Sequence, residues 1–351
     1  MSTFRVVHRF VTFGLLLAVA GLAAALAQDT ESARVEVTDL DRAAAREGVV
    51  VSRHAFATHF TAGERGGHAT LLDLRHAAAG AAEPSRHNVR FPGDLIFQGG
   101  PTVGSAESHA IYMLPNGKCP VATCWGNPEG FLRDLGQSNF IHVVDQYTGS
   151  YGNNRYTVGS HRSLSYKPPA APFTDADMEA VVHAVASKLG LTGYGHIYHV
   201  FLPPGQDECF TSTDGVCYSP DNSSTFVFCA YHSSVDFPDI GHVLYSVEPF
   251  QDVDGCSVRP GTPNGQLVDS TNDVLSHETI ETITDPDGSA WWNSVSLSLY
   301  GEEIGDECIF LVFTPTSVYS DPSLYYANGK LYATQPEYDN SVHGCSTGPR
   351  E

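Results

Sequence analysis

A histidine and two glutamates lie close together in the stretch SHETIETITDPDGSAWW, residues 276–292. On a helix, His277 and Glu281 would share one face because they are four residues apart. An imidazole nitrogen and a carboxylate oxygen can then bind the same zinc ion. Glu278 holds the position of the general base in the HExxH zinc peptidases. The spacing therefore predicts a metal site in which Glu281 replaces the second histidine of those enzymes and Glu278 accepts a proton from activated water.

A third ligand is expected from the acidic stretch GEEIGDEC, residues 301–308. Asp306 is preferred because Gly305 and Cys308 flank it and could fix the local backbone. Glu303 is expected beside the metal or the substrate. One histidine and two carboxylates suit Zn²⁺, and the set is hard enough to admit Ca²⁺ or Mn²⁺. The alternative is a solvated acidic helix without a metal, since short motifs of this kind also occur by chance.

The motif must be held by a helix with a definite start and end. We predict this helix over residues 271–284, between Ser270 as its cap and Pro286, which cannot continue it. Two further helices are predicted over 128–136 and 174–189, each beginning at a capping residue. Strands are predicted from apolar patterns and turn signals near residues 49–56, 108–115, 140–148, 195–205, 224–233 and 242–250.

The order of these elements predicts one α+β (mixed α/β) domain over residues 91–347, with a central mixed sheet and an active-site helix. Residues 1–27 have the charged start, apolar run and small-residue end of a signal peptide. Residues 28–90 are poor in aromatic side chains, which is typical of a leader, propeptide or linker that is poorly ordered. We therefore expect a secreted protein that is not membrane-bound once the signal peptide is removed.

The cysteine content agrees with export, because an even number of cysteines in a secreted chain indicates disulfides. Two pairs are close enough in sequence to form local loops, and the pairing of the other four is left open. The pairs are Cys119/Cys124 and Cys209/Cys217, and the other four are Cys229, Cys256, Cys308 and Cys345. The formal charge of −21 disfavours a nucleic-acid partner. Asn222 begins a sequon for N-glycosylation.

Several residues outside the motif are weaker candidates. His232 could lie over the substrate if its strand runs beside the motif helix, and Tyr231 could then donate to an oxyanion. Trp292 could stack on a sugar ring. His196 and His199 are interpreted as hydrogen-bonded histidines of the sheet, since histidine is often partly buried.

Several stretches together resemble the EXORDIUM family, also called phosphate-induced protein 1, whose members are exported and associated with the cell wall. These stretches are FQGGPTVGSAESHAIYMLP, FLPPG, FCAYHSS, LSHETIETITDPDGSAWW, GEEIGDEC and NGKLYATQPEYDNSVHGC, within residues 91–346. Plant members have a similar core, His-Glu-Leu-Ala-Glu followed by Asn-Pro, a tryptophan and Glu-Ile-(Ala/Gly)-Asp-x-Cys. The leader and the two local cysteine loops depart from that pattern, which leaves the substrate-facing surface open.

The motif is also similar to that of the zincin metallopeptidases, with Glu281 in place of their second histidine, and this resemblance implies a zincin-like domain. It implies that His277, Glu281 and Asp306 are metal ligands and that Glu278 is the general base. The leading hypothesis is a secreted, zinc-dependent, metallopeptidase-like hydrolase acting on a protein or peptide. The alternative is a non-catalytic extracellular protein of the cell wall, with a structural metal site or a surface that binds a wall polymer.

Overall fold

The computed structural model describes residues 35–36, 54–57, 91–213, 215–294, 296, 299, 301–308 and 323–348. The expected signal peptide and most of the expected leader lie outside these residues. From Val35 to Glu351 the chain forms one compact unit. Within the described residues, no helix is both long enough and apolar enough to cross a membrane.

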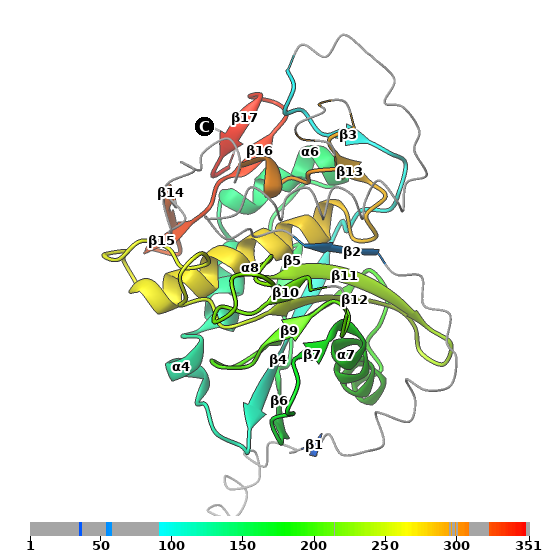
Figure 1. The fold of residues 1–351 in the computed structure, drawn as a ribbon. Helices are drawn as coiled ribbons and strands as arrows, with labels where there is room; N and C mark the ends of the chain where they lie inside the picture. Colours follow the sequence, from blue (N-terminus) through cyan, green and yellow to red (C-terminus); the bar gives the residue numbers. More distant parts are fainter. Residues whose placement is uncertain are drawn as a thin grey trace, which may run out of the picture. The chain divides into compact units, whose positions relative to one another are not determined.

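The centre of the domain is an eight-stranded sheet. Its strands are β1 (Val35–Glu36), β2 (His54–Ala57), β4 (Ala106–Pro115), β5 (Tyr156–Val158), β6 (Arg162–Tyr166), β8 (His196–Phe201), β11 (Tyr231–Phe237) and β12 (Gly241–Glu248). They follow the order β1-β6-β4-β8-β12-β11-β2, with β5 added beside β4 (Figure 1). Neighbours from β1 to β12 are parallel, whereas β11 is antiparallel to β12 and to β2. The sheet is therefore mixed, as the sequence predicts.

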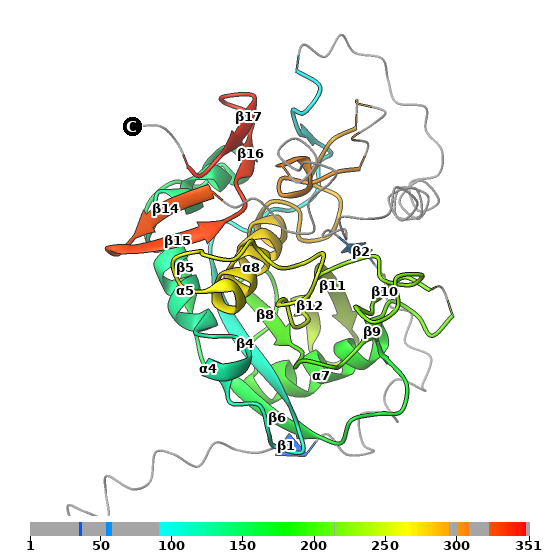
Figure 2. The ribbon, with the colours of Figure 1, turned by 60° about the vertical axis from the view of Figure 1, so that its left-hand side comes forward.

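Two long helices cover the two faces of this sheet, α7 (Asp175–Leu189) and α8 (Gln266–Thr284) (Figure 2). Neighbouring residues of β8 belong to different layers, because successive side chains of a strand point to opposite faces. Phe201 packs in the apolar cluster that contains Leu275 of α8, whereas Val200 packs in the cluster that contains Val182 of α7. The motif helix α8 and the helix α7 thus lie on opposite sides of the sheet.

Shorter elements complete the domain. Four of them, α5, η1, α6 and β15, pack against α8. The helical elements are α4 (Val121–Cys124), α5 (Pro128–Leu135), the 3₁₀ helix η1 (Phe140–Val144) and α6 (Asp145–Thr148). The strands are β3 (Ile96–Phe97), β7 (Phe173–Thr174), β9 (Glu208–Cys209), β10 (Cys217–Tyr218), β13 (Trp291–Trp292), β14 (Ser323–Ala327), β15 (Lys330–Thr334), β16 (Glu337–Asp339) and β17 (Gly344–Ser346).

The helix α8 is buried from Asp269 to its end although many of its residues are polar. Helices surrounded by protein are usually apolar. Here Thr279, Thr282 and Thr284 donate hydrogen bonds to the carbonyl groups four residues earlier, at 2.6, 2.6 and 3.1 Å. These bonds satisfy the hydroxyl groups inside the helix. The helix can therefore carry its ionisable residues into the centre of the domain.

The predicted start of α8 is wrong, because the helix begins earlier, at Gln266. Ser270 is not its cap. The Ser270 hydroxyl donates to the Gln266 carbonyl at 2.6 Å and accepts from the Val258 N–H at 3.0 Å. The start of α7 is as predicted: the backbone N–H and the hydroxyl of Thr174 both donate to the Asp177 carboxylate, at 2.9 and 2.8 Å.

The strand predicted over residues 140–148 is also wrong, since this stretch forms η1 and α6. Of the other predicted strands, residues 108–115 lie in β4, and β8 and β12 occupy most of 195–205 and 242–250. The strand predicted over 224–233 begins only at Tyr231, and that predicted over 49–56 appears as β2.

All eight cysteines form disulfides. The two local pairs, Cys119–Cys124 and Cys209–Cys217, are confirmed. The remaining pairs, Cys229–Cys256 and Cys308–Cys345, join residues more distant in sequence. Four disulfides are consistent with an extracellular protein.

Candidate metal centre

Three residues of α8 form a compact polar group. The His277 Nε2 atom lies 3.3 Å from Glu281 Oε1. One ligand atom from each of His277, Glu278 and Glu281 lies within 4.8 Å of the others, and all three side chains are buried. Two ligands of a tetrahedral zinc ion are roughly 3.3 Å apart when their bonds are about 2.0–2.1 Å long. The group therefore has the dimensions of a cation site.

The segment 301–308 brings Asp306 to the same place. Asp306 Oδ1 lies 3.9 Å from His277 Nε2, so the expected third ligand approaches the same imidazole, although Asp306 does not belong to the compact group of His277, Glu278 and Glu281. The backbone N–H groups of Gly305 and Asp306 donate to Glu281 Oε1 at 3.2 and 3.3 Å, which orients this carboxylate. Gly305 lies against the imidazole ring, because a Cβ atom at this position would be 2.4 Å from His277 Nδ1. No larger residue fits there without displacing a ligand.

A second group of possible ligands shares Glu281 with the first. His232 Nε2 on β11 lies 3.7 Å from Glu281 Oε2 and 3.3 Å from Glu303 Oε2. One ligand atom from each of these three residues again lies within 4.8 Å of the others. Glu281 therefore faces His277 with one carboxylate oxygen and His232 with the other. Glu303, expected beside the metal or the substrate, lies in this second group.

Glu337, the first residue of β16, is a buried acid that the sequence did not single out. Within the described part of the chain, neither of its carboxylate oxygens has a hydrogen-bond partner. A buried carboxylate without such partners must be neutralised by a proton or a cation. The side chain interacts electrostatically with His277, Glu281 and Asp306, so the cation that would neutralise it belongs to this centre. The donor set thus fits a divalent metal ion.

The pKa shifts follow from this crowding of acids. Burial alone would lower the pKa of His277, but the neighbouring carboxylates, Glu281 above all, hold it well above its usual range. Burial raises the pKa of Glu337 well above its usual value; His277 opposes this shift and nearby acids add to it. Burial likewise raises the pKa of Asp285, and Glu303 adds to that shift. Carboxylates outnumber imidazoles here, and a divalent cation would relieve their repulsion.

The sheet beneath α8 contributes a chain of polar contacts. His199 Nε2 lies 3.1 Å from the Ser108 hydroxyl, and its Nδ1 lies 2.9 Å from the Ser246 hydroxyl. Ser246 donates to Glu248 Oε1 at 2.7 Å. Burial raises the pKa of Glu248 to about 7, while the Ser246 hydrogen bond and the charge of His277 act in the opposite direction. His199 is therefore a hydrogen-bonded sheet histidine, as expected.

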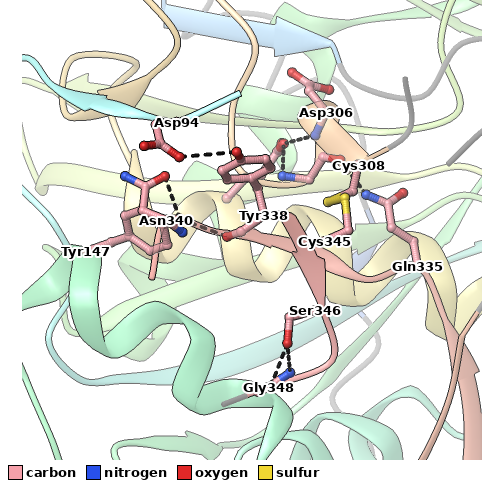
Figure 3. Close-up of a disulfide and its surroundings, with 12 residues drawn as sticks. Asp94, Tyr147, Asp306, Cys308, Gln335, Tyr338, Asn340, Cys345, Ser346 and Gly348 are labelled. Atoms are coloured by element: carbon pink, nitrogen blue, oxygen red, sulfur yellow. Dashed lines mark hydrogen bonds between the residues drawn. A yellow bond between two sulfur atoms is a disulfide. The ribbon is translucent and has the colours of Figure 1, made fainter. Parts of the chain in front are cut away.

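The C-terminal hairpin β16–β17 holds the segment that carries Asp306 (Figure 3). The disulfide Cys308–Cys345 joins the two directly. The Tyr338 N–H donates to the Ile304 carbonyl at 2.9 Å. Since Glu337 precedes Tyr338, the same hairpin places Glu337 and fixes the loop that approaches His277.

Two of the weaker candidates do not join the centre in the expected way. Tyr231 points to the other face of the sheet, where its hydroxyl donates to Asp175 Oδ1 at 3.0 Å and to Glu208 Oε1 at 3.1 Å. The alternation of side chains along β11 separates it from His232, so the oxyanion role expected for Tyr231 is wrong. Trp292 is half-buried and pairs with Ile96 between β13 and β3.

Asn222 is exposed, as a glycosylation site requires. Its carboxamide oxygen accepts from the Ser224 hydroxyl at 2.7 Å, which holds the sequon in a tight turn.

Comparison of the chain with protein-family models, with curated proteins and with solved structures finds no match. Statements about its chemistry therefore rest on its own residues and their geometry.

Proposed function

We propose that the protein is a secreted, zincin-like hydrolase of the EXORDIUM type that uses a divalent metal ion, most simply zinc, to cleave peptide bonds. The observation that carries this proposal is the placement of Glu278 beside His277 and Glu281, with Asp306 in reach of the same imidazole. An ionisable acid next to a three-ligand set is the arrangement that metal-dependent hydrolysis requires. The mixed sheet beneath the motif helix supports the zincin-like comparison.

In this proposal some side chains bind the metal ion and Glu278 transfers the proton. A divalent cation bound there supplies Lewis-acid activation of a water molecule and of the scissile carbonyl group. His277, Glu281 and Asp306 hold it, and the N–H groups of Gly305 and Asp306 keep the Glu281 carboxylate in place. Glu278 takes the proton from the attacking water and delivers it to the leaving nitrogen, as a general base and then a general acid.

The presence of nitrogen ligands favours zinc over calcium. Calcium takes oxygen ligands, whereas imidazole suits zinc and its neighbours in the transition series. His277 and His232 both approach Glu281, at 3.3 and 3.7 Å, so two imidazoles are available beside the carboxylates. Manganese fits less well than zinc for the same reason.

β2 is the last strand of the sheet beyond β11, and without β2 the free edge of β11 could take a peptide as the substrate. Residues 231–234 of β11 already pair with the antiparallel strand β2, so this edge accepts an extended chain next to His232. Peptide ligands bind such edges by adding a strand, with main-chain hydrogen bonds to the sheet. A substrate bound in this way would take the place of β2, which predicts that cleavage increases when the segment before residue 91 is removed.

Burial favours a second candidate function, a closed metal site without catalysis. Glu278 has no exposed surface, and neither do His277 and Glu281. A structural metal site is closed and fully coordinated by protein, whereas a catalytic one keeps a position open to water. In this second reading Glu278 would be a fourth ligand rather than a base.

The variant Glu278→Gln separates the two functions. We expect the purified protein to cleave casein in a chelator-sensitive way, measured for the full chain and after limited proteolysis of the segment before residue 91. In the hydrolase, Glu278→Gln retains the metal of the α8 centre and loses at least about 100-fold in cleavage rate. Glu129→Gln is the matched control, because Glu129 accepts a hydrogen bond from Tyr112 at 2.5 Å on α5, outside the centre.

Each outcome decides between the candidates. Retention of metal with loss of cleavage identifies Glu278 as the base. Loss of the metal in Glu278→Gln identifies it as a ligand of a closed site. A wild-type protein that binds metal and cleaves nothing, with or without the N-terminal segment, would refute the hydrolase proposal.

A further inference from the structure

A separate group of metal-ligating side chains lies on the other face of the sheet. Glu107 and His109 are on β4, and His196 begins β8. The strands pair in parallel with Glu107 opposite His196, and His109 follows Glu107 by two residues, so all three side chains point to the same face. That face is the one covered by α7, because Ile111 of β4, in the same alternation, packs in the α7 cluster. The group is therefore independent of the α8 centre.

The ligand atoms of this group are at the distances expected around one ion. His109 Nε2 lies 3.1 Å from His196 Nδ1 and 3.4 Å from Glu107 Oε2. His196 Nδ1 lies 3.9 Å from the same carboxylate oxygen. Two ligands of a tetrahedral zinc ion are separated by about 3.3 Å. Three atoms from two elements thus surround a position that suits one zinc ion.

The surroundings hold His109 in the form that binds a metal. Its Nδ1 lies 3.2 Å from the Ser160 carbonyl oxygen, which only accepts hydrogen bonds, so the proton of the neutral ring is on Nδ1. The lone pair of Nε2 then faces both His196 Nδ1 and the Glu107 carboxylate, so it is available to a cation held among the three side chains. A carbonyl partner on the second nitrogen is the usual device that orients metal-binding histidines. The Tyr198 ring, stacked on the imidazole with centroids 5.1 Å apart, fixes its plane.

Gly159 leaves the space that the group needs. A Cβ atom there would lie 2.4 Å from His109 Cε1 and 2.6 Å from the Glu107 carboxyl carbon. Any side chain at this position would push both ligands away. The buried imidazole of His109 is 1% exposed, whereas the side chains of Glu107 and His196 are 39% and 23% exposed, so solvent reaches one side of the group.

We propose that Glu107, His109 and His196 bind a second transition-metal ion of the zinc class, with water at the remaining coordination position. Two imidazole nitrogens and one carboxylate oxygen are typical zinc ligands. Such an ion joins β4 to β8, the two strands at the middle of the sheet. His196 is a hydrogen-bonded histidine of the sheet, as expected, and in this proposal it is also a metal ligand. The alternative is a structural hydrogen bond between His109 and His196 without a metal ion.

The test counts zinc ions in the whole protein. Wild-type protein and His196→Ala are stripped with chelator and titrated with Zn²⁺ by calorimetry, with total zinc measured after gel filtration. We expect His196→Ala to bind one equivalent of zinc fewer than the wild type, whatever the occupancy of the α8 centre. Glu107→Gln, which keeps the shape and removes the charge, should weaken this equivalent by at least about 10-fold.

His183→Ala is the matched control, because His183 contacts one carboxylate, Asp239, at 2.9 Å but belongs to no group of three possible ligands among the described residues. It should bind as much zinc as the wild type. Equal zinc binding by His196→Ala and the wild type would overturn the proposal and leave the His109–His196 hydrogen bond as the explanation. Because His196 lies on the opposite face from Glu278, casein cleavage should be the same in His196→Ala and wild type. The two proposals therefore fail in different measurements: the hydrolase proposal in casein cleavage, and this proposal in the zinc count of His196→Ala.

Discussion

The variant Gly305→Ala tests whether the loop at 301–308 sets the geometry of the α8 centre. A Cβ atom at this position would lie 2.4 Å from His277 Nδ1, 2.5 Å from His277 Cε1 and 3.0 Å from Glu281 Oε1. Carbon and nitrogen atoms cannot approach to 2.4 Å without a bond, so either the ring or the loop must move. His277 is fully buried on α8, and the loop is tied to β17 by a disulfide. Neither can move freely.

The size of the effect follows from the cost of overpacking. An extra carbon in a packed interior costs about 1–3 kcal/mol. If the whole cost falls on the position of the imidazole, the affinity for metal decreases by about 5-fold to about 150-fold. If part of it falls on the fold, the melting temperature decreases by about 2–4 °C for each kcal/mol in a domain of this size.

The assay measures zinc affinity by competition with a chelator, together with thermal unfolding of the metal-free protein. Gly344→Ala is the matched control, because Gly344 lies on β17 in the same hairpin and a Cβ atom there would meet nothing within 4 Å. We expect weaker zinc binding for Gly305→Ala and no change for Gly344→Ala. Wild-type zinc affinity and an unchanged melting temperature in Gly305→Ala would refute the close packing of the loop against His277.

Two further predictions concern charge. Glu337→Gln should weaken zinc binding by about 10- to 100-fold yet raise the stability of the metal-free protein, because it removes a buried carboxyl group whose oxygens have no hydrogen-bond partner in the described chain. Chelator competition measures the zinc affinity, and urea unfolding measures the stability. A variant that loses both zinc affinity and metal-free stability would contradict the reasoning. The ion pair with Asp287, whose Oδ1 lies 3.1 Å from His242 Nε2, outweighs burial and raises the pKa of His242, and Asp236 adds to the shift. The stability from this pair is therefore complete below the unfolded pKa of about 6.5 and is lost as the pH rises through the folded pKa. Urea unfolding should show a larger cost of His242→Gln at pH 5.5 than at pH 8.5, and equal costs would exclude the pair as the source.

Local signals predicted the parts of the fold that local chemistry decides. The start of α7 follows from Thr174 and Asp177, whose hydrogen bonds form within four residues. The start of α8 could not be predicted in this way. Ser270 has the side chain of a cap, but its hydroxyl accepts a hydrogen bond from the N–H of Val258, a residue outside the helix. A helix that is packed on all sides draws its boundaries from tertiary contacts as well as from capping.

The error over residues 140–148 has a different cause. The apolar run FIHVV contains the β-branched residues Ile141, Val143 and Val144, whose type is common in strands. The buried residues, however, are Phe140, Ile141, Val143, Val144 and Tyr147. They recur with a period near 3.6 residues, so they form one face of a helix. Burial of that face outweighs the strand propensity of the individual residues. The period of the pattern was the better guide.

The candidate centre was predictable only in part, because some of its residues are brought together by tertiary contacts. His277, Glu278 and Glu281 lie on one helix, so their proximity follows from helix geometry alone. Glu337 and His232 reach them from β16 and β11, through contacts that no local pattern in the chain encodes. The place of Asp306 could be predicted in part. Its distance in sequence from His277 does not indicate that the two are close, but the nearby Cys308 indicates a constraint on the backbone. The disulfide to Cys345 supplies that constraint.

Burial and charge together connect the metal to folding. The carboxyl groups of Glu278, Glu281, Glu303, Asp306 and Glu337 are hydrated when the chain is unfolded and buried when it is folded. Without a cation, burying them requires protonation or repulsion, each of which costs free energy. A divalent ion that binds only the folded chain offsets that cost by mass action. A stabilising role and a catalytic role for the ion at α8 are therefore compatible, and what distinguishes a hydrolase from a closed structural site is whether Glu278 remains free to exchange a proton with water.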